Sequence, residues 1–101
     1  MRAIRIALTL AAALALGAAA PALALPPGNA ERGAKIYERC LACHAIDRDR
    51  TGPRHAGLFG RRAGSVPGFA YSPAMKKAGE DGLIWNDETL DGFLQSPTTY
   101  V

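Results

Sequence analysis

The chain has few residues of the kinds that usually hold metals or catalyse reactions. Its 101 residues include two cysteines and two histidines. A structural zinc site would need every one of them, which makes such a site an unfavourable interpretation. The chain also has no convincing run of alternating apolar and polar residues and no internal repeat. Without a strand signal, the predicted class is all-α.

The two cysteines fall in one motif, Cys40-Leu41-Ala42-Cys43-His44. C-x-x-C-H is the attachment pattern of c-type haem. Cysteines at i and i+3 lie on one face of a helical turn, so each thiol can form a thioether with one vinyl group of the same porphyrin. His44 follows directly and can offer a ring nitrogen to the iron from that side. The motif predicts one covalent haem c per chain.

The cysteine pair has two other interpretations. One is a thiol–disulfide redox pair, although the surrounding sequence lacks the βαβ pattern that usually accompanies it. The other is a structural disulfide between Cys40 and Cys43, which would close too short a loop to contribute much stability. Haem attachment is therefore the preferred interpretation.

The N-terminal stretch has the pattern of a secretory signal. Two arginines precede an apolar run over residues 6–20, and an A-x-A pattern ends at Ala24. This predicts a signal peptide over residues 1–24 and a mature domain over residues 25–101, released into the periplasm of a Gram-negative bacterium with no membrane span. The alternative is an uncleaved anchor, since the run is near the lower limit for a span of about 20 residues.

Charge is distributed unevenly along the chain. Residues 31–77 contain ten basic and four acidic residues, whereas residues 78–101 contain five acidic and no basic ones. This asymmetry could orient the molecule toward a negatively charged protein partner. A solvated surface without a partner explains it equally well. Nothing in the pattern indicates nucleic acid.

Capping signals predict three helices separated by loops rich in glycine and proline. Each helix has a favourable first residue and a stop signal near its end. In chain order, Asn29 caps a helix from Ala30 to about Arg39, Ser72 caps a helix that begins at Pro73 and stops before Gly79, and Asn86 caps a helix that Pro97 ends. Gly33 lies inside the first helix, where it costs about 1 kcal/mol relative to alanine. A glycine there suits a point where another helix crosses closely.

These features together resemble a class I cytochrome c, the small mono-haem family that includes mitochondrial cytochromes c and bacterial cytochromes c2. The resemblance covers about residues 29–101. It rests on motifs spread over the whole mature chain: Gly33 and Tyr37, Cys40 to His44, Gly52-Pro53, Gly57 to Arg61, Pro67 to Ser72, and Trp85 followed by Leu90 and Leu94. It implies a small cytochrome c fold, with short helices and loops wrapped around one covalently bound haem.

The resemblance also implies roles for individual residues. His44 would be the proximal iron ligand, and the Pro53 carbonyl would accept a hydrogen bond from its other ring nitrogen. Three donors, Arg61, Tyr71 and Trp85, would hold a haem propionate, because a buried carboxylate needs hydrogen bonds and positive charge. Core packing is the alternative for Tyr71 and Trp85, and surface charge for Arg61. Four apolar residues are expected in the haem pocket: Leu58, Phe59, Leu90 and Leu94.

Two departures from the family pattern affect the site. His55 stands where the family usually has leucine, and Ala56 where it usually has histidine. The family layout places His55 on the proximal side, so a packing or hydrogen-bonding role is expected rather than iron ligation. The family's distal methionine loop and C-terminal helix have no counterpart before Val101, which predicts a fragment of a longer cytochrome. Met75 is expected to be an interior side chain near the haem.

The predicted function is a monomeric periplasmic electron carrier, not an enzyme, whose haem cycles between Fe(III) and Fe(II). Its implied partners are redox proteins: a cytochrome bc1-type complex, a terminal oxidase, a reaction centre or a dehydrogenase. If the chain ends at Val101, an alternative is a five-coordinate haem protein that binds small ligands or has peroxidase-like activity. A C-x-x-C thiol–disulfide oxidoreductase is the third possibility.

Overall fold

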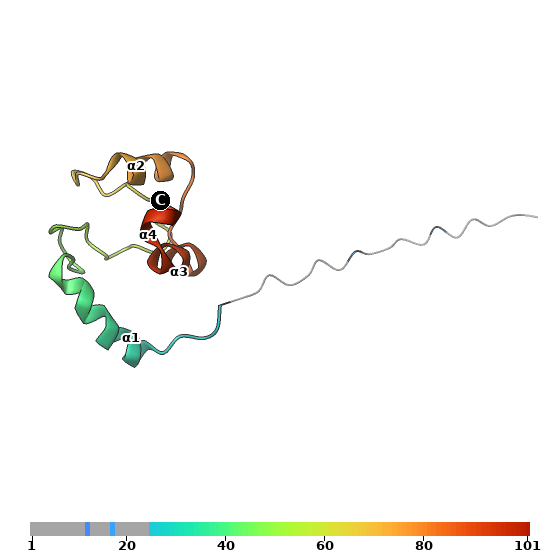
Figure 1. Ribbon diagram of the computed structural model, residues 1–101, viewed down its shortest axis with the longest axis horizontal. Helices are drawn as coiled ribbons and strands as arrows, with labels where there is room; N and C mark the ends of the chain where they lie inside the picture. Colours follow the sequence, from blue (N-terminus) through green and yellow to red (C-terminus); the bar gives the residue numbers. More distant parts are fainter. Residues whose placement is uncertain (1–11, 13–16, 18–24) are drawn as a thin grey trace, which may run out of the picture.

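The computed structural model describes residues 25–101, together with residues 12 and 17; the predicted signal peptide otherwise lies outside the described residues. Short helices alternate with long irregular segments (Figure 1). The elements are α1 (Ala30–Tyr37), the 3₁₀ segment η1 (Glu38–Ala42), α2 (Pro73–Glu80), α3 (Asp87–Gln95) and α4 (Pro97–Tyr100). In the described part, β pairing is limited to one isolated antiparallel bridge between Arg62 and Ile84. The predicted all-α class is confirmed.

The three predicted helices begin at their predicted caps. The Asn29 side chain accepts a hydrogen bond from the Arg32 backbone N–H at 2.8 Å, and Ser72 caps α2 in the same way. Asn86 and Thr89 form a reciprocal capping box at the start of α3. Each cap satisfies backbone donors that have no partner within the helix, which is typically worth about 1 kcal/mol.

Two predicted helix ends differ from the structure. The first helix changes to 3₁₀ geometry at Glu38 instead of continuing to Arg39. Gly79, predicted to follow the second helix, lies inside α2 and is buried. A Cβ at this position would lie under 3.0 Å from the Ala63 carbonyl group. The glycine therefore permits a close approach between α2 and the chain around Ala63, and the helix continues past it.

No helix of the described residues crosses α1 closely at Gly33, so within this part of the chain the glycine is tolerated and not required. No described atom lies within 4 Å of a Cβ built at Gly33, apart from the helix's own backbone and the adjacent residues. α1 also contains no buried residue.

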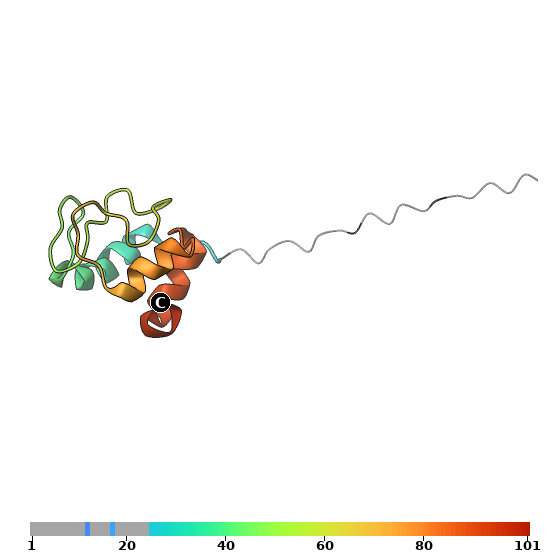
Figure 2. The ribbon, with the colours of Figure 1, turned by 90° about the horizontal axis from the view of Figure 1, so that it is seen from above.

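The buried apolar residues lie outside the helices. They are Ala45, Ala63, Val66 and Trp85. Backbone hydrogen bonds hold the chain around them, including Gly60 N–H to the Trp85 carbonyl at 2.7 Å and Trp85 N–H to the Arg61 carbonyl at 2.9 Å. Figure 2 shows the long irregular segment, residues 43–72, arching beside the helices. The core is thus organised by irregular chain.

None of the helices that the structure describes is both long and apolar enough to cross a membrane.

Candidate haem site

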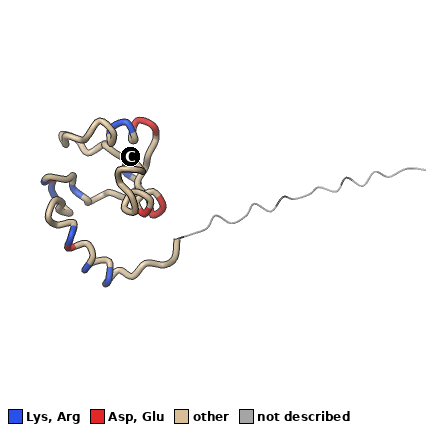
Figure 3. The backbone as a smooth tube through the Cα atoms, in the orientation of Figure 1, with Lys and Arg blue, Asp and Glu red and all other residues tan. Residues whose placement is uncertain are grey.

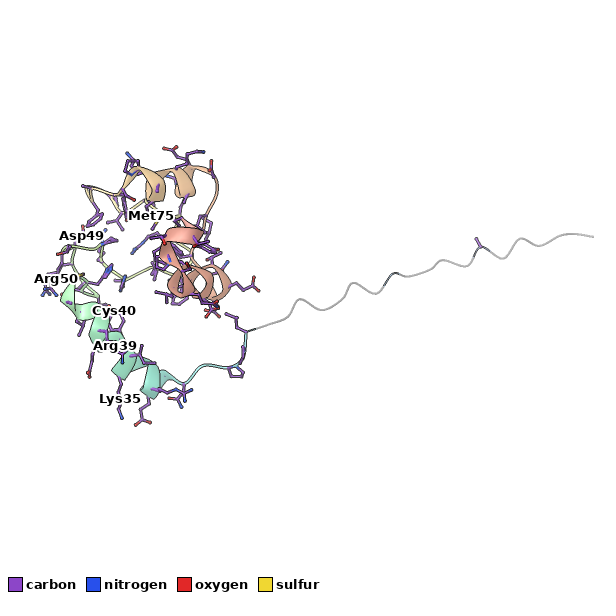
Figure 4. The ribbon with its side chains drawn as sticks, viewed as in Figure 1. Lys35, Arg39, Cys40, Asp49, Arg50 and Met75 are labelled. Atoms are coloured by element: carbon purple, nitrogen blue, oxygen red, sulfur yellow. The ribbon has the colours of Figure 1, made fainter. Side chains whose placement is uncertain are left out.

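A cavity of about 690 Å³ lies between η1, the irregular segment, α2 and α3. This volume is within the roughly 300–1,000 Å³ range that small-molecule and cofactor sites occupy. Figure 4 shows Cys40 at the end of the first helical stretch and Met75 on α2, and both residues line the cavity. The cavity therefore joins parts of the chain that are far apart in sequence.

Six of the seven predicted site residues line this cavity: Cys40, His44, Pro53, Arg61, Tyr71 and Trp85. Cys43 is exposed and is not among the lining residues. Both thiols are free. Cys40 lies inside η1 and Cys43 directly follows it. In 3₁₀ geometry residues i and i+3 eclipse each other, which suits attachment of both sulfurs to one planar group.

The His44 ring has a defined orientation. Its Nδ1 lies 2.7 Å from the Pro53 carbonyl oxygen, the expected hydrogen bond. A carbonyl can only accept, so Nδ1 must carry the proton. In a neutral imidazole, this leaves the lone pair of Nε2 free for a metal.

Backbone hydrogen bonds fasten the loop that follows the motif. The Gly52 N–H donates to the Cys43 carbonyl at 2.8 Å, and the His55 N–H donates to the Ala45 carbonyl at 3.1 Å. The Arg50 guanidinium donates to the Leu41 carbonyl. Arg50 belongs to a segment that the sequence marks only as a charged loop, and nothing in its pattern predicts this bond. These contacts fix the position of the Pro53 carbonyl relative to His44.

Arg61 is anchored beside the cavity. One guanidinium nitrogen donates to the Arg54 carbonyl at 2.8 Å, and another donates to the Ala56 carbonyl. The guanidinium has further N–H donors beyond these two. Its charge and remaining donors suit an anionic group at the cavity wall.

Tyr71 and Trp85 pack against neighbouring aromatic rings, and each carries a polar hydrogen-bonding group. The Tyr71 hydroxyl accepts a hydrogen bond from the Val66 N–H at 3.0 Å, and the Tyr71 ring packs edge-on against Phe69. Among the described residues its own O–H proton has no acceptor, so it can donate to a carboxylate. Trp85 is buried, with its ring 5.1 Å from that of Phe93.

His55 contacts the predicted iron ligand. Its ring is stacked on that of His44, with centroids 4.0 Å apart and planes at 22°. Its Nδ1 lies 2.9 Å from the Tyr37 hydroxyl oxygen. Burial lowers the pKa of His55, and the nearby His44 and Arg61 charges lower it further. The packing and hydrogen-bonding role expected for His55 is observed, whereas its partnership with Tyr37 has no sequence signal.

The remaining wall is mostly apolar. Leu58, Phe59, Leu90 and Leu94 line the cavity as predicted, and Met75 does so from α2. The residues present fit a covalently held haem: two free thiols three positions apart, an imidazole with a free Nε2, apolar side chains for the macrocycle, and Arg61 and Tyr71 as donors for carboxylates.

Known proteins with similar sequences and structures are cytochromes c. Cytochrome c2 of Afifella marina is 50% identical over 72 residues, which are 68% of this chain and 58% of that protein. Cytochrome c of Euglena viridis is 46% identical over 77 residues, 73% of this chain and 72% of that protein. The ferricytochrome c2 structure from Rhodopseudomonas palustris superposes with a TM-score of 0.71 at 36% identity, covering 72% of this chain and 64% of that one.

The similarity covers only part of the length of these relatives. No protein-family model matches the chain. The chain spans 58% of the Afifella marina protein and 64% of the similar Rhodopseudomonas palustris cytochrome c2, less than two thirds of either. Cytochromes of this family carry one covalent haem c, and Cys40, Cys43 and His44 match its C-x-x-C-H motif. Sequence and fold together show that the chain belongs to the class I cytochromes c.

Proposed function

We propose that the chain is a one-electron carrier with a single haem c attached through Cys40 and Cys43 and ligated by His44. The main support is that Cys40 and His44 line one largely apolar cavity together with Pro53, Arg61, Tyr71 and Trp85. When bound, the haem supplies reversible exchange of one electron between ferric and ferrous iron. The protein provides attachment, orientation and electrostatics.

His44 and Pro53 set the proximal side of this site. The 2.7 Å hydrogen bond between His44 Nδ1 and the Pro53 carbonyl fixes the imidazole tautomer and makes the Nε2 lone pair a stronger ligand for iron. A more basic ligand favours the more highly charged oxidised iron. Apolar side chains such as Leu58, Leu90 and Phe93 limit water access and oppose that effect, because a dry site disfavours added charge. The balance between the two tunes the potential.

Arg61, Tyr71 and Trp85 would hold a propionate. Arg61 offers positive charge at the wall, and Tyr71 offers an O–H proton. Partial burial of a carboxylate is unfavourable unless such donors neutralise and bind it. These three residues would therefore hold a bound haem through its propionate.

The proposal extends to location and partners. The signal-like pattern of residues 1–24 supports secretion to the periplasm. Figure 3 shows basic residues along α1 and in the loop after it, and acidic residues at the end of α2 and in α3, with the two lysines of α2 beside its acidic end. Such a separation orients a carrier in the field of a charged redox partner. Membrane respiratory or photosynthetic complexes and soluble dehydrogenases are partners of this kind.

Redox titration of the secreted, haem-loaded protein followed by visible spectroscopy tests this function. A single reversible one-electron transition is expected. A haem that cannot be reduced and reoxidised reversibly would contradict the carrier role. Addition of carbon monoxide to the reduced protein then separates two haem functions: an unchanged spectrum supports the carrier, and a shifted spectrum supports an open, ligand-binding iron.

A further inference from the structure

Three ring side chains lie in a row at the cavity wall, two of them stacked and the third joined by a hydrogen bond. Tyr37 is the last residue of α1, His55 belongs to the irregular segment, and His44 is the predicted iron ligand. The Tyr37 hydroxyl bonds to His55 Nδ1 at 2.9 Å, and the His55 ring stacks on His44 at 4.0 Å. All three line the cavity.

We propose that His55, held by Tyr37, is a positioning residue that fixes the rotation of the His44 ring about its bond to the iron. The proposal rests on the proposed function, in which His44 is that ligand. His55 itself does not touch the iron in this arrangement; it acts through the His44 ring.

The geometry explains why His55 is suited to this task. The Pro53 hydrogen bond holds one atom at the edge of the His44 ring. The His55 ring plane lies at 22° to the His44 ring plane, so the two rings contact each other face to face. This contact resists rotation of the His44 ring, because rotation would reduce the stacked area. The ring also lies close against the Gly52 backbone, where an added Cβ would lie under 3.0 Å from its Cε1, Nε2 and Nδ1 atoms. His44 is thus confined by a hydrogen bond, a stacked ring and a side-chain-free backbone.

Tyr37 makes His55 a rigid support. The two residues are 18 positions apart, and their hydrogen bond links α1 to the irregular segment. The rings also lie close together, with centroids 5.7 Å apart. A histidine fixed through its Nδ1 has one preferred ring plane, whereas a leucine at this position would offer neither a flat face nor a hydrogen-bonding nitrogen. The departure from the family's usual leucine therefore changes how the ligand is supported.

Rotation of the ligand plane has a direct spectroscopic signature. Groups around a metal-ligating histidine set its ring orientation and thereby tune the metal. In the oxidised, paramagnetic protein, the orientation of the ligand plane affects the anisotropy of the electron paramagnetic resonance spectrum. It also affects the NMR shifts of the haem methyl groups and of the His44 ring protons. A role limited to packing would change the stability without changing these values.

The test compares the oxidised, haem-loaded wild type with four variants. His55→Leu removes both the flat face and the hydrogen-bonding ring nitrogen, His55→Phe keeps a flat ring, Tyr37→Phe removes only the hydrogen bond, and Leu83→Ala alters a half-buried apolar residue outside the cavity wall. We expect the His44 proton shifts and the resonance anisotropy to change most in His55→Leu and less in Tyr37→Phe. They should return most of the way to wild type in His55→Phe and stay unchanged in Leu83→Ala.

The outcomes separate this proposal from the proposed function. Wild-type protein without haem would overturn both. Haem-loaded His55→Leu with wild-type His44 shifts and anisotropy, or with changes no larger than those in Leu83→Ala, would overturn the positioning role alone. If His55→Leu does not accumulate, His55→Phe and Tyr37→Phe decide. A near-wild-type His55→Phe beside a changed Tyr37→Phe supports the proposal, whereas changes in His55→Phe larger than those in Tyr37→Phe would contradict stacking as its basis.

Discussion

Helix α1 and the irregular segment of residues 43–72 contrast in an unexpected direction. α1 has a well-formed N-cap and an acidic residue in its first turn, yet none of its residues is buried. The irregular segment has no helix and only the isolated bridge at Arg62, yet it contains Ala45, Ala63 and Val66, three of the four buried apolar residues in the described chain. It also supplies most of the cavity wall.

This contrast shows that regular secondary structure and tertiary stability are separate properties here. α1 forms because its local signals favour a helix. The irregular segment keeps its shape because its backbone groups bond to distant chain and its small residues permit close contacts. Substitutions in the two regions should therefore differ in sign as well as in size.

The largest effect is expected for Gly79→Ala. The new Cβ would meet the Ala63 carbonyl group, which is backbone and cannot rotate away, so α2 would have to move off the irregular segment. Overpacking of this kind should lower the free energy of unfolding by about 3 kcal/mol. For a domain of this size that is a fall in Tm of more than about 10 °C. Thermal unfolding of the haem-loaded chain by circular dichroism measures it, and an unchanged Tm would contradict the close approach.

Gly52→Ala should have a smaller but still large effect. Its Cβ would press on the His44 ring, a side chain that can shift, although the Pro53 bond and the His55 stack resist the shift. We expect a loss of about 2 kcal/mol, measured by denaturant unfolding. Wild-type stability with unchanged His44 NMR shifts would show that the ring is not confined at this face.

Asn86→Ala tests the N-terminal cap of α3, a helix that lines the cavity. It removes the side-chain half of the capping box with Thr89. The expected loss is about 1 kcal/mol in chemical unfolding, and Asn86→Ser, which keeps a capping oxygen, should recover most of it. Equal losses in the two variants would mean that the cap does not contribute.

The smallest effect, of opposite sign, is expected for Gly33→Ala. A Cβ there meets no described atom within 4 Å apart from the helix itself and its neighbours. Alanine should stabilise the helix by roughly 0.5–1 kcal/mol, seen as a small rise in Tm. A clear fall in Tm would show instead that another surface covers α1 at this point.

The helix starts could be predicted from the sequence because capping depends on a few adjacent residues. Asn29, Ser72 and Asn86 each supply an oxygen to a backbone N–H three residues later, and no distant chain is involved. The end of α2 could not be predicted, because the burial of Gly79 depends on Ala63 in another part of the chain. Local glycine signals indicate either a stop or a close contact, and only the fold separates them.

The candidate site shows the same division. Six of its seven predicted residues line one cavity. These residues could be predicted because several motifs, each at its usual spacing, point to the same cofactor. The Tyr37–His55 pair and the Arg50–Leu41 contact were not predicted, since each depends on how the loop after the motif closes. The exposed position of Cys43 beside a cavity-lining Cys40 likewise depends on the local backbone after η1. Whether both sulfurs attach to one haem stays a prediction.

The most direct test of the haem assignment is the intact mass of the secreted protein after denaturation, alongside a Cys40→Ala/Cys43→Ala variant. Covalent attachment predicts that the denatured wild type keeps the mass of one haem and has no reactive thiol. The double variant should have the mass of the polypeptide alone. A wild-type chain that denatures to bare polypeptide, with two free thiols or one disulfide, would contradict the haem assignment and favour a thiol redox pair.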